Sequence, residues 1–183
     1  MLLRKQLQAM PDGGVVIVAA PRNPFRCPPG PYERVSLMAH YLKQHKPKSK
    51  ILIYDAKDKF SKQPLFQQGW QALYPGMIEW ISESEGGAIE AVDTGNMTVI
   101  PTFGDPVKGN VINMIPPQKA GAIAHTAGLT GDGAWCRVDQ RTFESAVHKD
   151  IHVIGDAAIA NPMPKSGFAA SSQGKVCAAA IAA

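Results

Sequence analysis

Short apolar runs alternate with longer amphipathic segments through the first part of the chain. The runs at residues 14–20, 50–55 and 77–81 are typical of buried strands, because they are apolar, short and rich in β-branched residues. The segments 31–45 and 62–74 instead have apolar positions at helical spacing, and the first carries proline in its opening turn. This order predicts a βαβαβ unit with a parallel sheet.

The remainder of the chain predicts several short elements and a long Ala-rich helix at its end. We expect a hairpin of residues 88–93 and 97–103 around Thr94-Gly95-Asn96, a strand at 111–115, a helix at 119–126, a glycine-rich loop at 128–133, a strand at 151–155 and a helix at 166–183. The fold class is therefore α/β, built from doubly wound, Rossmann-like βαβ units. A change of character near residues 103–109 predicts two domains, 1–105 and 106–183.

The turn after the first strand carries unusual chemistry. In a doubly wound domain this turn usually holds a glycine-rich phosphate loop. Here residues 26–34 read RCPPGPYER, and proline has no N–H to offer a phosphate. The turn therefore presents the thiol of Cys27. Although Asp55 could supply the acid of a nicotinamide site, the prolines deny the pyrophosphate its donors, so we expect an NAD-like unit that does not bind NAD.

A second signal is the Gly155-Asp156 pair, which follows the apolar run that ends at Ile154. A carboxylate at the end of a strand can accept hydrogen bonds from sugar or ribityl hydroxyls, and ligands of open α/β sheets lie outside such strand ends. The helix after Asn161 would point its free N–H groups at the same ligand. The alternatives are an ordinary turn at Gly155-Asp156 and a plain N-cap role for Ser166.

Composition narrows the functional classes. The 183 residues carry a net charge of +4, 45% hydrophobic and 19% charged residues, which is typical of a soluble globular protein. The lysines of residues 43–62 are not interleaved with aromatics, so a solvated face is favoured, an acidic partner surface is the main alternative, and nucleic-acid binding is disfavoured. No window has the apolar length of a membrane span, and the five histidines lack the spacing of a metal site.

Three segments together resemble a known family. CPPGPYER (27–34), VINMIPPQKAG (111–121) and IHVIGDAAIANPMPKSGFAASSQGKV (151–176) are similar to the flavoprotein subunit of flavocytochrome c sulfide dehydrogenase, which is related to sulfide:quinone oxidoreductases. The resemblance implies a fold with two dinucleotide-binding domains and FAD as cofactor. The family's FAD phosphate loop is not found here, so we expect this chain to be an internal fragment of a longer flavoprotein.

The resemblance also implies roles for individual residues. Cys27 would be one half of a redox-active disulfide whose partner lies in the family's C-terminal domain. Asp156 would bind the FAD ribityl chain, with Gly155 permitting close approach. The flavin ring would be approached by Lys165, Ser166 and Gly167 and lined by Pro116 and Pro117, a pair that would equally serve as a strand stop. Two further thiols are not at the partner's position: Cys177 is interpreted as a small buried side chain, and Cys136 as either a buried thiol or one near the flavin pocket.

The function implied by this resemblance is oxidation of sulfide through a cysteine and FAD, with electrons passed to a c-type cytochrome subunit in the periplasm. An export signal would then precede residue 1. Two alternatives remain: an enzyme like sulfide:quinone oxidoreductase, and a truncated Rossmann-like module without catalytic activity. We expect the chain alone to bind FAD poorly and to lack activity, because the disulfide partner and the adenosine and diphosphate contacts would be missing.

Overall fold

The computed structural model describes residues 2–183 and divides them into two compact units. Unit 1 comprises the chain up to Asn23 together with Pro29–Pro116. Unit 2 comprises Pro24–Pro28 together with Pro117–Ala183. The short segment between β1 and α2 of unit 1 therefore packs within unit 2.

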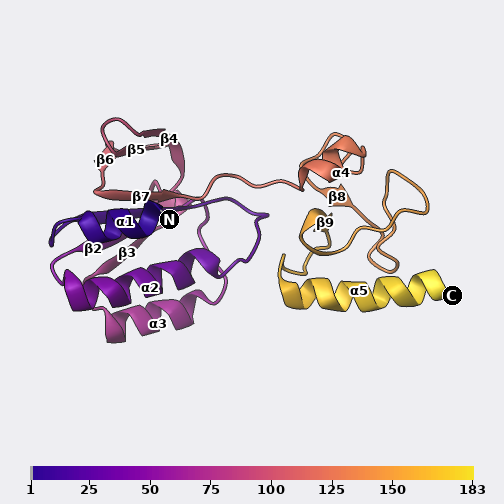
Figure 1. The fold of residues 1–183 in the computed structure, drawn as a ribbon, viewed down its shortest axis with the longest axis horizontal. Helices are drawn as coiled ribbons and strands as arrows, with labels where there is room; N and C mark the ends of the chain where they lie inside the picture. The colour runs from indigo at the N-terminus through magenta and orange to yellow at the C-terminus, as the bar shows by residue number, and fades with distance from the viewer. Residues whose placement is uncertain (1) are drawn as a thin grey trace. The chain divides into compact units, whose positions relative to one another are not determined.

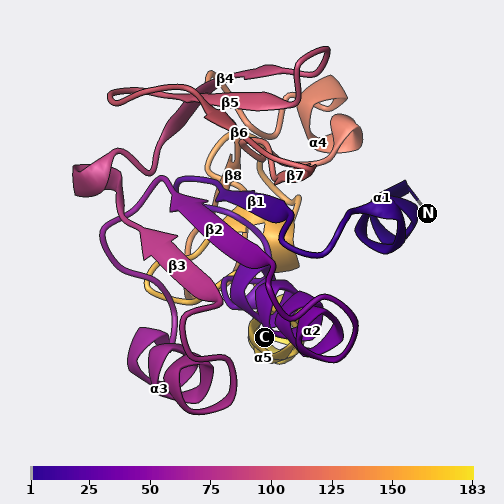
Figure 2. The same cartoon turned by 90° about the vertical axis from the view of Figure 1, so that its left-hand side faces the viewer.

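Unit 1 is built on a parallel sheet of four strands in the order β3-β2-β1-β7. Its elements are α1 (Leu2–Ala9), β1 (Val15–Ala20), α2 (Gly30–His45), β2 (Lys50–Asp55), α3 (Gln63–Leu73), β3 (Ile78–Ile81) and β7 (Val111–Met114). Helices α2 and α3 lie on one face of this sheet (Figures 1 and 2). The apolar cluster on that face includes Val16, Val35, Leu42 and Ile53, which are fully buried.

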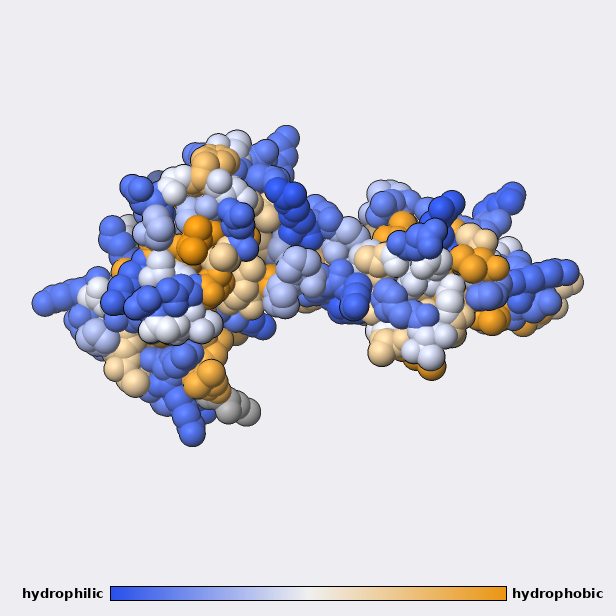
Figure 3. Space-filling model, turned by 90° about the horizontal axis from the view of Figure 1, so that it is seen from above, coloured by the Kyte–Doolittle hydropathy of each residue, from blue (hydrophilic) through white to orange (hydrophobic). Residues whose placement is uncertain are grey.

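The opposite face of the sheet is covered by an antiparallel meander (Figure 2). It follows the short turn η1 (Glu83–Glu85) and consists of β4 (Ile89–Asp93), β5 (Thr98–Pro101) and β6 (Val107–Lys108). A second apolar cluster, with Ile17 and Val99 fully buried, joins the meander to the sheet. Seen from this side, unit 1 exposes mainly hydrophilic residues with a few apolar ones among them (Figure 3).

Unit 2 contains four short elements and one 16-residue helix around two small apolar clusters. They are α4 (Ala122–Thr126), β8 (Cys136–Arg137), η2 (Gly155–Ala157), β9 (Ala158–Ile159) and α5 (Gly167–Ala182). Strands β8 and β9 pair in parallel, and η2 packs beside α5 (Figure 1). No helix within residues 2–183 has the length and apolar character needed to cross a membrane.

The α/β fold class and the βαβαβ unit are confirmed, and two sequence-based expectations are corrected. Residues 151–155 do not form a buried strand: His152 makes one isolated bridge to Glu144, and Ile151 and Ile154 stay 42% and 44% exposed. The boundary expected at 105/106 moves to 116/117. The reason is that β7 hydrogen-bonds in parallel to β1 and so belongs to the sheet of unit 1.

A buried polar network holds the sheet of unit 1 to its helices. The carboxylate of Asp55, at the end of β2, is fully buried. It accepts hydrogen bonds from the Tyr32 hydroxyl at 2.6 Å and the Trp80 indole N–H at 3.0 Å, and it pairs with the ammonium of Lys57. The pKa of Tyr32 is raised mainly by burial and, to a smaller extent, by the negative charge of Asp55. The phenol therefore stays a neutral hydrogen-bond donor.

We predict that Asp55→Asn lowers the free energy of unfolding by about 3 kcal/mol, because it leaves the buried Lys57 cation without its carboxylate. Urea denaturation followed by tryptophan fluorescence measures this. The double variant Asp55→Asn/Lys57→Met should recover most of the loss, and the exposed control Glu90→Gln should change stability by less than about 0.5 kcal/mol. A loss below about 1 kcal/mol for the single variant would contradict the structural role of the pair.

Candidate functional site

The thiol turn, which we define as residues 24–28, is fixed in unit 2 by backbone hydrogen bonding. The N–H of Cys27 donates to the carbonyl of Lys165 at 2.8 Å, and Arg26 and Lys165 form an isolated parallel bridge. Phe25 is only 3% exposed and anchors the turn in the interior. Cys27 itself has a φ of 54° and an exposed, free thiol. The backbone is thus held while the sulfur remains accessible.

Arg26 ties the thiol turn to two other segments of unit 2. Its backbone N–H donates to the side-chain oxygen of Gln118 at 2.9 Å, and its guanidinium donates to the carbonyl of Lys119 at 2.6 Å. The guanidinium lies 3.9 Å from the carboxylate of Asp156 and 5.1 Å from the ring centre of Trp135. Arg26 is therefore oriented by several partners, unlike a freely solvated arginine.

The side chain of Lys165 lies at the centre of this arrangement and is 8% exposed. Its ammonium donates to the carbonyls of Asp156 at 2.9 Å and Ala158 at 2.7 Å, and it lies 3.9 Å from the ring centre of Trp135. Burial holds the pKa of Lys165 below its usual value, while the Asp156 carboxylate opposes that shift. The same residue thus binds the thiol turn through its carbonyl and the Gly-Asp turn through its ammonium.

The Gly-Asp turn and the start of α5 offer groups that suit a hydroxyl-bearing, anionic ligand. Gly155 has a φ of 71°, and its N–H donates to the buried side chain of Gln173 at 2.6 Å. The side chain of Asp156 is 40% exposed, so its carboxylate can accept from ligand hydroxyls. Ser166 caps α5 by accepting from the N–H of Ala169, and a Cβ built on Gly167 would meet nothing within 4 Å. A half-exposed carboxylate beside a helix N-terminus fits part of an FAD site.

The two remaining thiols are buried. Cys136 is fully buried opposite Ala158 in the β8–β9 pair, where burial raises its pKa against the opposing charge of Lys165. Cys177 is 7% exposed inside α5, in a cluster with Phe143 and Ala160. The interpretation of Cys177 as a small buried side chain is confirmed.

The structure brings together six of the residues singled out from the sequence, all in unit 2: Cys27, Gly155, Asp156, Lys165, Ser166 and Gly167. Pro116 and Pro117 are instead the two residues at the boundary between the units. Sequence reasoning missed Gln118 and Trp135, which hold Arg26 and Lys165. The only sequence signal for them was position, since Gln118 follows the two prolines and Trp135 precedes Cys136.

The end of β2 bears on nicotinamide binding in unit 1. A nicotinamide site of this fold uses an acid there to bind a ribose hydroxyl. Both oxygens of Asp55 are already occupied by Tyr32, Trp80 and Lys57, and its side chain is fully buried. The expectation that unit 1 does not bind NAD thus gains a second physical reason beside the prolines. Within residues 2–183, no group of three or more His, Cys, Asp or Glu side chains could hold a metal ion.

We predict that a small thiol reagent modifies one cysteine of the native chain rapidly and the other two slowly. Cys27 is exposed, whereas Cys136 and Cys177 are buried and burial also disfavours the reactive thiolate of Cys136. Stopped-flow reaction with a chromogenic disulfide measures this. Cys27→Ser should abolish the fast phase, and the matched controls Cys136→Ser and Cys177→Ser should retain it. A fast phase that survives in Cys27→Ser would show that the thiol turn is not the accessible one.

The fold is similar to solved structures of larger proteins. A chain of the Tetrahymena thermophila mitochondrial ATP synthase is 19% identical, with a TM-score of 0.64, and 94% of our chain aligns with 43% of it. The HOCl-induced flavoprotein disulfide reductase RclA from Escherichia coli is 13% identical, with a TM-score of 0.58. The alignment covers 90% of our chain and 34% of the RclA chain. An NAD-dependent persulfide reductase from A. fulgidus is 14% identical, with a TM-score of 0.57. The alignment covers 96% of our chain and 32% of the reductase chain.

These likenesses establish the fold, and our chain spans less than half the length of each of these proteins. The family is established by the sequence itself. Residues 1–116, more than half of the chain, match the family described as sulfide dehydrogenase (flavocytochrome c) flavoprotein chain, central. The chain therefore belongs to the family of the flavoprotein chain of flavocytochrome c sulfide dehydrogenase.

Proposed function

We propose that this chain supplies the reactive thiol and part of the FAD site of a flavoprotein that oxidises sulfide and passes the electrons to a c-type cytochrome. The observation that carries the proposal is the hydrogen bond between Cys27 and Lys165, which sets the thiol turn against the residue that precedes the N-cap of α5. Family membership supports it. FAD, when bound, supplies an acceptor for an electron pair and releases the electrons singly.

The proposed reaction at the thiol is a disulfide exchange. Cys27 would form a disulfide with a cysteine outside this sequence, since Cys136 and Cys177 are buried away from reagents. Hydrosulfide attacks one sulfur, the S–S bond breaks, one cysteine becomes a persulfide and the other leaves as a thiolate. The hydrosulfide proton passes to solvent. The exposed position of Cys27 gives the small anion access to the reacting bond.

The charges around the thiol turn suit this anionic chemistry. The cations of Arg26 and Lys165 both lie against Trp135, and within residues 2–183 the carboxylate that faces them is that of Asp156. The local balance is positive, which favours an approaching hydrosulfide and a departing thiolate. Because both cations are fixed by hydrogen bonds to carbonyls, they need not reorganise as charge develops.

Asp156 and the start of α5 would hold the cofactor. The carboxylate of Asp156 would accept from ribityl hydroxyls, and the first-turn N–H groups of α5 would face the anionic edge of the reduced ring. Lys165, Ser166 and Gly167 would form the approach to that ring, with Pro116 and Pro117 beside it. The c-type cytochrome partner and the periplasmic location are part of the same proposal. The alternative electron acceptor is a quinone, and the activity test below distinguishes the two acceptors.

In the flavoprotein that contains this sequence, Asp156→Ala should weaken FAD binding at least about tenfold, because the hydrogen bonds to a charged acceptor are lost. Titration of the apoprotein with FAD, followed by visible absorption, measures the affinity. The control Asp132→Ala removes an exposed carboxylate of the glycine-rich loop and should leave the affinity unchanged. Equal affinity in Asp156→Ala and Asp132→Ala would remove Asp156 from the cofactor site.

Sulfide oxidation by the same flavoprotein should fall at least about a hundredfold in Cys27→Ser, because the hydroxyl cannot form the disulfide that hydrosulfide attacks. The FAD spectrum should be retained, and Cys177→Ser should keep full activity. Turnover is measured with a c-type cytochrome and, separately, with a soluble quinone as acceptor. Reduction of the quinone alone would overturn the cytochrome assignment, and full turnover in Cys27→Ser would overturn the role of the thiol.

A further inference from the structure

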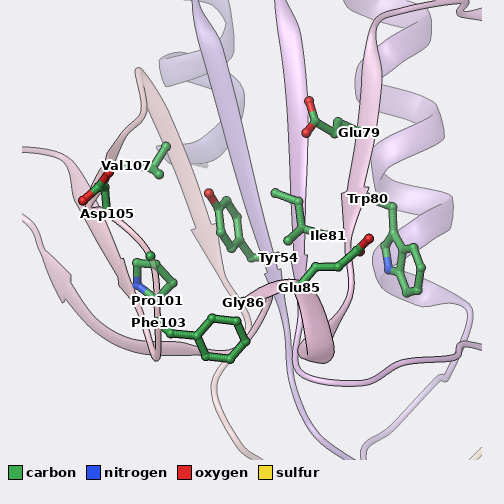
Figure 4. Close-up of a pocket in the computed structure, with 11 residues that line it drawn as sticks. Tyr54, Glu79, Trp80, Ile81, Glu85, Gly86, Pro101, Phe103, Asp105 and Val107 are labelled. Atoms are coloured by element: carbon green, nitrogen blue, oxygen red, sulfur yellow. The ribbon is translucent and has the colours of Figure 1, made fainter.

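Unit 1 contains a cavity of about 450 Å³ between the sheet and the meander (Figure 4). Tyr54 of β2 and Ile81 of β3 form one side, and Pro101, Phe103 and Val107 of the meander form the other. Phe103 packs against Gly86, where an added Cβ would lie 2.9 Å from the Phe103 carbonyl oxygen. Gly86 has a φ of 92°, so the backbone that brings Phe103 to the cavity depends on this glycine.

Tyr54 lines the cavity (Figure 4). Its side chain is 6% exposed, and no hydrogen bond joins its phenol oxygen to another of residues 2–183. Within the same residues, the one fully buried side-chain N or O atom without a partner is Nε2 of His125, so the Tyr54 oxygen keeps access to the cavity. The pKa of Tyr54 is raised mainly by burial and, to a smaller extent, by the negative charge of Glu79, so the phenol is neutral. Its oxygen is thus available as an acceptor for a donor that enters the cavity.

The charged residues around the cavity are all acidic. Glu79, Glu85 and Asp105 line it, and the lining residues that the structure describes include no lysine or arginine. Glu85 uses one carboxylate oxygen to accept from the N–H and hydroxyl of Ser82, which leaves its other oxygen free of that contact. In a chain with a net charge of +4, this is a locally negative site.

We propose that this cavity binds an organic cation that carries a guanidinium or alkylammonium group. The carboxylates of Glu79 and Asp105 would neutralise the charge, the Tyr54 hydroxyl would accept one N–H, and the ring of Phe103 would contact the cation or its alkyl stem. A metal ion is disfavoured because the acidic side chains do not gather into a coordinating group within residues 2–183. The proposal is independent of the flavin chemistry of unit 2.

The test is a titration of the 183-residue chain with n-butylguanidinium, followed by ¹H–¹⁵N NMR. Saturable shifts are expected at amides around the cavity, with a dissociation constant on the order of 1 mM. The neutral isostere n-butylurea should bind at least about tenfold more weakly, because it lacks the charge. A second ligand, acetyl-glycyl-arginyl-glycinamide, distinguishes the two possible sources of the cation. If the peptide binds comparably, the cation is an arginine side chain of a partner. If n-butylguanidinium binds and the peptide does not, the cation is a free small molecule.

Variants locate the binding groups. Glu79→Gln should weaken n-butylguanidinium binding about fivefold and Tyr54→Phe about threefold, through loss of a charge and of an acceptor. The control Glu90→Gln makes the same charge change on β4 outside the cavity and should leave the affinity unchanged. Equal binding of n-butylurea, equal losses in Glu79→Gln and Glu90→Gln, or shifts confined to other parts of the chain would each overturn the proposal. The spectrum of each variant reports whether it is folded.

Discussion

The hydrogen bond from the N–H of Cys27 to the carbonyl of Lys165 is the contact on which the arrangement of the candidate site in unit 2 depends. It joins a segment that follows β1 in the sequence to the segment that leads into α5. Because Lys165 also donates to the carbonyls of Asp156 and Ala158, one residue fixes both the thiol turn and the Gly-Asp turn. The exposed thiol, the half-exposed carboxylate and the helix start therefore share one unit. Without that link, the thiol turn would be held in unit 2 by Phe25 and Arg26 alone.

The unusual backbone of Cys27 makes sense in this setting. A φ of 54° is uncommon for a residue other than glycine and carries a cost of about 1–3 kcal/mol. The cost is offset by the hydrogen bond to Lys165, by the buried ring of Phe25 and by the contacts of Arg26 with Gln118 and Lys119. The adjacent prolines reduce the entropy lost when the turn is ordered. Together these constraints hold the backbone that carries the exposed sulfur.

The sequence predicted unit 1 well because its elements are determined locally. The apolar runs of β1 and β2, the proline in the first turn of α2 and the glycine of the β4–β5 turn each mark an element within a few residues. Unit 2 was predicted less well. Strands β8 and β9 have two residues each and exist only because residues 136–137 pair with 158–159. The run at 151–155 looked like a buried strand, but it has only the isolated bridge to Glu144 to support it.

The candidate site shows the same division between local and distant information. The motifs around Cys27 and Asp156 were visible because their residue types are unusual at those positions. The residues that connect them were not, since Trp135 and Gln118 act through contacts with Arg26 and Lys165 that no local pattern encodes. Lys165 was singled out for a flavin contact, and the structure adds that its ammonium donates to the backbone carbonyls of Asp156 and Ala158. The sequence motifs predicted a candidate site, and the long-range contacts show which side chains hold its segments together.

Two features of unit 1 that disfavour nicotinamide binding are physically coupled. The prolines remove the N–H donors that a pyrophosphate needs, and Asp55 is buried among Tyr32, Trp80 and Lys57, which occupy the acceptors that a ribose needs. Tyr32 itself belongs to the CPPGPYER motif and lies in the first turn of α2. The motif that carries the thiol thus also provides Tyr32, one of the three groups that hydrogen-bond to the Asp55 carboxylate.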